Sequence, residues 1–297
     1  MPLDPPPAPI ADLLIVGGLT VDRFVDGSTA PGGSVLHSGI AAATARARVA
    51  TVTVAGDEPA AAAGLARLGT IGPLVHQPSP TSVVYAHREA DGHRVLTLEA
   101  DCEPLGHDTI GRAPAARVAL LAPIADELPS DAIGAVAQLV GPDRIVLLIQ
   151  GWLRDLRVGE AVRPLALASL AKDLVEAFGH ADAIVVSTED LAEGADDPFG
   201  QVRALRQLIG PRPLIVVTLG ADGFVLDDPA ASRIVASVPR RVVLGVPTVG
   251  AGDTFGAGLA LSLAAGATPA DAAAAGAEAV IGMLESRGSP SADPAFR

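Results

Sequence analysis

The chain has 297 residues, 49% of them hydrophobic and only 3% aromatic, and it carries a formal net charge of −13 at pH 7. This length allows one large domain, and a core of Ala, Val, Leu and Ile favours helices packed on a parallel sheet over an aromatic-rich all-β fold. The acidic balance argues against nucleic acid or an anionic membrane as a partner, and the single cysteine, Cys102, excludes an internal disulfide and a cysteine-based metal cluster.

The proline-rich residues 1–11 predict a disordered lead-in to one domain at residues 12–297. No basic segment followed by an apolar stretch opens the chain, so we expect no signal peptide. The Ala-rich run near the C-terminus is interrupted by Pro269, Asp271 and Glu278 and does not suit a membrane span. We therefore expect a cytoplasmic protein.

Strands and helices alternate along most of the chain, which is the pattern of βαβ units and predicts a parallel sheet. In open sheets of this kind, ligands bind at the carboxyl ends of the strands. We expect strands at residues 12–18, 49–58, 117–124, 144–151, 183–187 and 213–220, and helices at 59–69, from about 130, at 165–178 and at 198–209, followed by a short β pair and two C-terminal helices.

Residues 82–98 interrupt this alternation. Two β-rich runs flank Asp91 and Gly92, a pair that favours a tight hairpin turn. We interpret this hairpin as a small lid beside the main sheet.

The stretch PTVGAGDTF, Pro247 to Phe255, places a carboxylate directly behind a run of small residues. Small residues let the backbone N–H groups of Ala251, Gly252 and Asp253 point into one volume, where the dipole of the following helix adds positive charge. Such a pocket attracts an anion such as a phosphoryl group, and Asp253 at its edge is suited to accept a proton from an attacking hydroxyl. On these residues alone, a helix cap after an ordinary turn is the simpler interpretation.

The longer stretch TVGAGDTFGAGL resembles the C-terminal signature of the PfkB (ribokinase-like) family of carbohydrate and nucleoside kinases. In that family the aspartate is the catalytic base and the preceding small residues form an anion hole, which implies these roles for Asp253 and for Gly250, Ala251 and Gly252. The resemblance implies an α/β fold: a ribokinase-like three-layer α/β/α sandwich with a mostly parallel central sheet and a small, reduced β lid. It also implies ATP and Mg²⁺ as cofactors.

Further motifs follow in the order of the family. LLIVGGLTVDRF resembles its first strand and implies a substrate contact by Asp22, and the run beginning PGGSVLHSGIAAA resembles its N-terminal signature, with Gly32 and Gly33 as a substrate-side hinge. VVTLGADGFVL resembles its nucleotide-binding element. The implied nucleotide-binding residues are Thr218, Gly220, Gly223 and Thr248.

Three positions depart from the family pattern. His37 stands where the family usually has Asn, and it either contacts substrate or fills the start of a helix. The magnesium element of the family reads STED here, so Ser187, Glu189 and Asp190 are the implied metal-binding residues, although a plain helix cap explains them equally well. Pro247 replaces an acidic residue of a potassium site, which puts a requirement for monovalent cations in doubt.

The run IQGWLRDL is similar to the branch of the family that contains the myo-inositol kinases and implies that Gln150 and Arg154 bind substrate. A surface ion pair with a neighbouring carboxylate is the alternative for Arg154, and Trp152 either stacks on a sugar ring or packs in the core. The connection from Asp22 to Gly32 is short, so we expect the two usual lid strands there to be missing and the lid to consist of the 82–98 hairpin alone.

Together these features predict ATP-dependent phosphorylation of a hydroxyl on a small sugar or polyol, an inositol being one candidate. A nucleoside kinase and a catalytically weak binding or regulatory homologue are the alternatives. The expected partners are the small-molecule acceptor and ATP, with no nucleic acid or membrane, in a monomer or homodimer.

Overall fold

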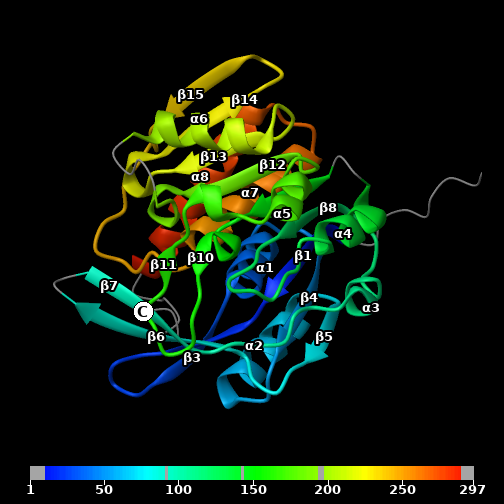
Figure 1. Ribbon diagram of the computed structural model, residues 1–297, viewed down its shortest axis with the longest axis vertical. Coiled ribbons are helices and arrows are strands. Elements are labelled where there is room, and N and C mark those ends of the chain that lie inside the picture. The colour runs from blue at the N-terminus through cyan, green and yellow to red at the C-terminus, as the bar shows by residue number, and fades with distance from the viewer. Residues whose placement is uncertain (1–10, 91–92, 142–143, 193–196, 289–297) are drawn as a thin grey trace, which may run out of the picture.

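The central layer is a nine-stranded sheet in the order β15-β14-β13-β12-β9-β8-β1-β4-β5 (Figure 1). The computed structural model describes residues 11–90, 93–141, 144–192 and 197–288. The strands from β5 to β13 in this order pair in parallel, whereas β14 and β15 pair antiparallel at one edge. The strands of this sheet are β1 (Ala11–Gly18), β4 (Val49–Ala55), β5 (Leu74–Pro78), β8 (Ala116–Leu121), β9 (Ile145–Leu148), β12 (Ala183–Ser187), β13 (Leu214–Thr218), β14 (Phe224–Asp228) and β15 (Arg233–Ser237).

Helices cover both faces of the sheet, because alternate residues of each strand point to opposite faces. In β1, Leu14 and Val16 pack with one set of helices and Leu13 and Ile15 with the other, and all four are fully buried. The first set is α3 (His107–Ile110), α4 (Ala132–Val140), α5 (Lys172–Phe178) and α6 (Pro198–Ile209), and the second is α1 (Ser34–Thr44), α2 (Pro59–Ile71), α7 (Ala251–Ala264) and α8 (Pro269–Gly288). The predicted three-layer α/β/α sandwich is therefore confirmed.

The predicted elements differ from the observed ones mainly at their ends. Helix α6 spans the predicted residues 198–209, but α5 begins at Lys172 and not at Leu165. The backbone N–H of Leu165 donates to the carbonyl of Leu153, so this segment continues the small hairpin of β10 (Arg154–Asp155) and β11 (Arg163–Pro164). Ala11 already belongs to β1, and the rest of the predicted lead-in, like the Asp91–Gly92 turn, lies outside the described residues.

The prediction of a lid made of one hairpin is wrong. β2 (Thr20–Arg23) and β3 (Thr29–Gly32) join β6 (Val83–Ala90) and β7 (His93–Ala100) in a four-stranded sheet of order β3-β2-β6-β7. Gly27 takes φ 82° in the β2–β3 turn, where Asp26 accepts hydrogen bonds from Ser28, so strands of only four residues suffice to form the hairpin. A segment this short and polar carries little strand signal in the sequence.

The lid is also fastened to the body of the protein. The segment between β10 and β11 pairs with β7: Leu98 donates to the carbonyl of Glu160, Gly159 donates to Leu98, and Val162 donates to Leu96. The lid strands β6 and β7 project from the body beside this segment (Figure 1).

Among the described helices, none combines the length and the hydropathy that a membrane crossing requires.

Helices α7 and α8 approach closely through glycines. A Cβ on Gly276 would lie 2.8 Å from the carbonyl oxygen of Phe255, whereas a Cβ on Gly282, in the same helix, would meet nothing within 4 Å. We expect Gly276→Ala to lower the free energy of unfolding by about 1–3 kcal/mol because a backbone must move to admit the methyl group.

The matched variant Gly282→Ala should raise the free energy of unfolding by up to about 1 kcal/mol, because alanine favours the helix and fits in open space. Thermal unfolding followed by circular dichroism measures both. Equal midpoints for the two variants would contradict the close approach of α7 and α8.

Candidate active site

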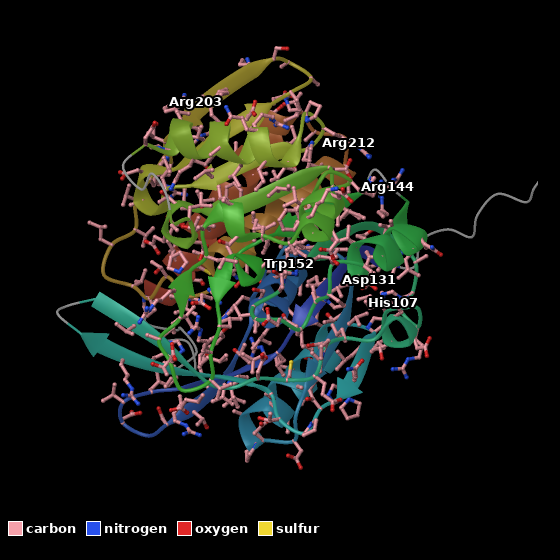
Figure 2. The ribbon with its side chains drawn as sticks, in the orientation of Figure 1. His107, Asp131, Arg144, Trp152, Arg203 and Arg212 are labelled. Carbon is pink, nitrogen blue, oxygen red and sulfur yellow. The ribbon has the colours of Figure 1, made fainter. Side chains whose placement is uncertain are left out.

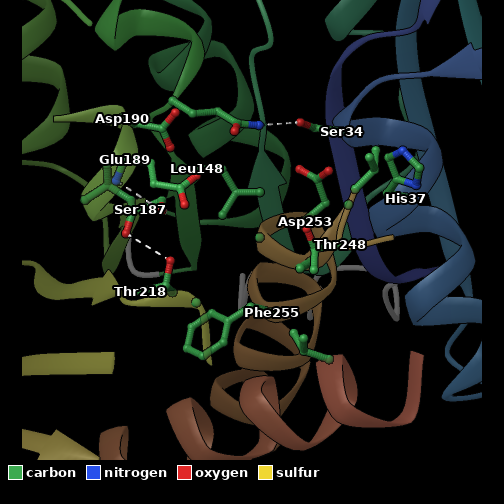
Figure 3. A pocket seen from close by; sticks show the side chains of 18 of the residues that line it. Ser34, His37, Leu148, Ser187, Glu189, Asp190, Thr218, Thr248, Asp253 and Phe255 are labelled. Carbon is green, nitrogen blue, oxygen red and sulfur yellow. Dashed lines mark hydrogen bonds between the residues drawn. The ribbon is translucent and has the colours of Figure 1, made fainter. Parts of the chain in front are cut away.

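A cavity of about 880 Å³ opens between the lid, the carboxyl ends of the central strands and the start of α7. Figure 3 shows Asp253 in this cavity between His37 on one side and Glu189 and Asp190 on the other. Gly32 is the one predicted site residue outside the cavity wall: it packs behind Asp22 and Thr20. The predicted residues that line the wall are Asp22, Gly33, His37, Gln150, Arg154, Ser187, Glu189, Asp190, Thr218, Gly220, Gly223, Thr248, Gly250, Ala251, Gly252 and Asp253.

Asp253 is a buried carboxylate in the first turn of α7. It is 7% exposed, and its Oδ1 has no hydrogen-bond partner among the described residues. Gly250 precedes the helix in the left-handed conformation, with φ 78°. The carboxylate therefore faces the cavity at the positive end of the helix dipole without a protein donor of its own.

The backbone amides at this helix start are not equivalent. The N–H of Ala251 donates to the carbonyl of Thr248 at 3.0 Å, so it is already occupied. Within the part of the chain that the structure describes, the N–H groups of Gly252 and Asp253 have no acceptor. Gly252 and Asp253 therefore keep N–H groups available at the helix start, whereas the N–H of Ala251, which was predicted to join the anion hole, is bound to Thr248.

His37 closes the side of the site next to α1. A Cβ on Gly250 would lie 2.5 Å from Cγ of His37, so only glycine fits beneath the imidazole ring. Burial lowers the pKa of His37 and keeps the ring neutral near pH 7, although Asp253 and Asp22 act in the opposite direction. Ser38, the next residue, donates to the carbonyl of Asp253 at 3.1 Å and fixes α1 against α7.

Polar groups on the lid side point into the same cavity. Oδ1 of Asp22 lies 3.2 Å from Nε2 of His87 and accepts from the hydroxyl of Thr20 at 3.3 Å. Across the cavity, Nε2 of Gln150 donates to the hydroxyl of Ser34 at 2.9 Å (Figure 3). These groups offer both donors and acceptors to the cavity.

Arg154 lies inside the cavity, and its predicted alternative as a surface ion pair is wrong. Its Nη1 donates to the carbonyl of Ile124 at 2.9 Å, and its Nη2 lies 3.9 Å from Oδ1 of Asp190. The guanidinium also sits 5.8 Å from the ring centroid of Tyr85, whose hydroxyl donates to the same Ile124 carbonyl at 2.7 Å. Arg154 thus connects the lid, through Tyr85, to the acidic side of the cavity.

Glu127 organises this region, and sequence reasoning missed it. An acidic pair in a loop, such as Asp126–Glu127, is typical of solvated side chains, yet Glu127 is 0% exposed. Its carboxylate accepts the backbone N–H groups of Gly18, Ile124 and Ala125 at 2.7–2.8 Å. Burial raises the pKa of Glu127, and the three amide donors oppose that shift.

Trp152 is a core residue and not a sugar platform. Its Nε1 donates to the carbonyl of Leu128 at 2.7 Å, and its ring packs against Phe178. Figure 2 shows Trp152 within the body of the molecule, where its side chain is buried.

The acidic side of the cavity provides some of the oxygen ligands that a metal ion would need. Ser187 caps a 3-10 turn by accepting the N–H of Glu189 at 3.3 Å, as the capping interpretation predicts. Burial raises the pKa of Asp190, and Arg154 opposes it. No cluster of three or more metal-ligating side chains occurs in the described ranges. The carboxylates of Glu189 and Asp190, which line the cavity, fit Mg²⁺, because this ion retains several waters and needs few protein ligands.

An apolar slot extends from Thr218 and the β13–β14 turn to α8. Gly220 and Gly223 have positive φ in that turn, and a Cβ on Gly223 would collide with the carbonyl of Ser237. The slot is lined by Phe224, Val242, Val243, Phe255, Ala277, Val280, Ile281 and Leu284. A flat, largely apolar group of aromatic size suits this surface.

Residues 155–293 match the family model described as pfkB family carbohydrate kinase, so the resemblance to that family expected from the sequence is confirmed. A fructokinase of Klebsiella pneumoniae is 40% identical over 103 residues, which cover 34% of this chain and 32% of the relative. The aligned segment therefore spans about a third of the curated relative's length.

Solved structures of the same fold cover nearly the whole chain. A pyrophosphate-dependent kinase of the ribokinase family, complexed with a pyrophosphate analog and myo-inositol, has a TM-score of 0.73 at 19% identity and covers 89% of this chain and 92% of its own. A ribokinase of Arabidopsis thaliana complexed with ribose and ATP has a TM-score of 0.68 at 16% identity, with coverages of 96% and 95%. At these identities the likeness establishes the ribokinase-like fold.

We expect Glu127→Ala to lower the free energy of unfolding by at least about 3 kcal/mol, because it leaves three buried N–H groups without an acceptor. Glu127→Gln should cost less, since an amide oxygen still accepts while its NH₂ faces one backbone N–H. Glu103→Ala, which removes an exposed glutamate, is the matched control and should stay within about 0.5 kcal/mol. Urea unfolding measures the free energy of unfolding of all three variants. An unchanged value for Glu127→Ala would show that the carboxylate does not stabilise this loop.

Proposed function

We propose that this protein is a PfkB-type phosphotransferase that moves the terminal phosphoryl group of ATP to a hydroxyl of a small sugar or polyol. The observation that carries the proposal is the buried Oδ1 of Asp253, which has no partner in the described chain and lies beside the two unoccupied amides of Gly252 and Asp253. A base and an anion-binding pair side by side are what phosphoryl transfer to an alcohol requires.

Asp253 acts as the base in this proposal. The acceptor hydroxyl donates a hydrogen bond to Oδ1, and its oxygen attacks the terminal phosphorus in line with the departing ADP. As the new O–P bond forms and the P–O bond to ADP breaks, the proton passes to the carboxylate. The amides of Gly252 and Asp253, with the helix dipole of α7, stabilise charge on the transferred group.

The acceptor lies between the lid and α1, close to Asp22, Gln150 and Arg154. A wall of paired donors and acceptors without a concentrated positive patch favours an uncharged polyhydroxylated molecule over an acidic one. Relatives with myo-inositol, ribose and fructose in their names support a sugar or polyol as the acceptor class. His37 and Gly33 complete this side of the cavity as proposed substrate contacts.

The donor lies along Thr218, Gly220, Gly223 and Thr248, with its base in the apolar slot. Mg²⁺ bound to the phosphates would neutralise their charge, and Glu189 and Asp190 would hold its waters. Pyrophosphate is the donor named for one fold relative. The apolar slot favours a nucleotide here, because pyrophosphate has no apolar group to bury.

The two alternative functions have weaker support. A nucleoside acceptor needs an aromatic face for its base, but Tyr85 is 2% exposed and its ring is covered by the Arg154 guanidinium. A pure binding protein has no use for a buried carboxylate that lacks a partner, since such a group costs stability.

We predict that Asp253→Asn lowers kcat by at least about 1,000-fold, because the amide cannot accept the proton. ATP should still bind, because the amide keeps the shape of the site. A coupled assay of ADP release with a panel of sugars and inositols measures kcat, and calorimetry measures nucleotide binding. Asp222→Asn, in the β13–β14 turn, is the control for the loss of one carboxylate. Retained turnover in Asp253→Asn removes this residue from the role of base.

We predict that ATP supports turnover and pyrophosphate does not, and that Val280→Trp raises the KM for ATP about tenfold or more by filling the slot with little effect on kcat. Reaction rates measured with each donor, at a fixed acceptor concentration, test the choice of donor and give the KM for ATP. Turnover with pyrophosphate that Val280→Trp leaves unchanged would reverse the assignment of the donor.

A further inference from the structure

The last turn of α8 reaches back to the loop before α7 through a single arginine. Nη1 of Arg287 donates to the carbonyl of Pro247 at 2.8 Å and to the carbonyl of Val249 at 2.7 Å. These two carbonyls flank Thr248, and Gly250 follows directly. Arg287 is half-buried and does not line the cavity, so its contacts are with the loop backbone and not with a ligand.

Two carbonyl oxygens that converge on one point attract a cation. Here the cation belongs to the chain itself: the guanidinium remains charged under all ordinary conditions, although burial lowers its pKa. The same charge adds to the effect of burial in lowering the pKa of His37, whose ring packs against Gly250.

The loop that Arg287 holds determines which amides face the cavity. The carbonyl of Thr248, between the two bound carbonyls, accepts the N–H of Ala251 and begins the turn into α7. Gly250 then adopts φ 78°, and the N–H groups of Gly252 and Asp253 that follow it have no acceptor among the described residues. A shift of the carbonyls at residues 247 and 249 would therefore rotate the peptide planes at the helix start.

We propose that Arg287 is a positioning residue for the anion-binding amides: by binding the carbonyls of Pro247 and Val249 it holds the Gly250 turn in the conformation that leaves Gly252 and Asp253 free to bind phosphate. This inference rests on the proposed phosphoryl transfer. It implies that the chain supplies its own cation to this loop and needs no dissolved monovalent cation there.

The test compares Arg287→Ala with Arg240→Ala in the full-length protein. Arg240 is an exposed arginine whose guanidinium faces Glu278 on the same helix α8, outside the cavity wall, so it controls for the loss of one positive charge. We expect Arg287→Ala to lower kcat about 10- to 100-fold with the KM for the acceptor within about threefold, because misplaced donors affect the transition state more than substrate binding. Arg240→Ala should remain within about twofold of wild type.

Two readouts separate positioning from mere stability. Guanidinium chloride at about 20 mM should restore part of the activity of Arg287→Ala, whereas sodium chloride at equal ionic strength should not. Hydrogen exchange should become faster in Arg287→Ala for the hydrogen-bonded amides of Ala251 and Thr254, which close the turn around Gly250, and should stay unchanged in Arg240→Ala. Arg287→Lys keeps the charge on a shorter donor group and should be intermediate, which provides a second variant if Arg287→Ala folds poorly.

A kcat and an exchange rate in Arg287→Ala within twofold of wild type overturn the inference even if the wild type is an active kinase. The absence of transfer by the wild type with any donor and acceptor overturns the proposed function instead, and the exchange measurement still decides the role of Arg287.

Discussion

The site depends on the buried carboxylate of Asp253, whose Oδ1 has no hydrogen-bond partner in the described part of the chain. An unsatisfied buried acceptor costs about 1–3 kcal/mol, and more when it is charged. For Asp253 the cost is reduced by the positive end of the α7 dipole and by the amides of the same helix turn, while neutral His37 offers packing without a competing charge. In the proposed mechanism this unpaired Oδ1 is the atom that accepts a proton from a bound hydroxyl.

Elements distant in the sequence hold this carboxylate in place. Helix α1 contributes the His37 ring over Gly250 and the Ser38 hydroxyl on the Asp253 carbonyl. Helix α8 contributes the Arg287 guanidinium on the loop carbonyls and packs on α7 through Gly276, where no side chain fits. Small residues in α7 and α8 are therefore a condition for the geometry of the site, because the helices must approach closely to bring Arg287 to the loop.

The lid side of the cavity, where we propose that the acceptor binds, is supported separately through the carbonyl of Ile124. Ile124 O accepts from both Tyr85 and Arg154, and the amide of Ile124 donates to buried Glu127. The lid residue Tyr85 and the substrate-side Arg154 are thereby fixed relative to each other. The β10–β11 segment adds backbone hydrogen bonds to β7, so a movement of the lid would be transmitted to Arg154 and onward to Asp190.

The sequence by itself determined the layered α/β fold and the position of α6, because these depend on local periodicity. It also identified the Asp253 loop, because such a run of small residues before a carboxylate occurs in few kinds of structure. It did not reveal the β2–β3 strands, whose pairing comes from a partner strand more than sixty residues away, or the burial of Glu127, which follows from amides contributed by β1 and its own loop. It also assigned the Ala251 amide to the anion site, whereas the turn directs that N–H to Thr248. Only the tertiary structure decided which donors remain free and which arginine enters the site, because hydrogen bonds between distant segments are settled by geometry that local sequence does not encode.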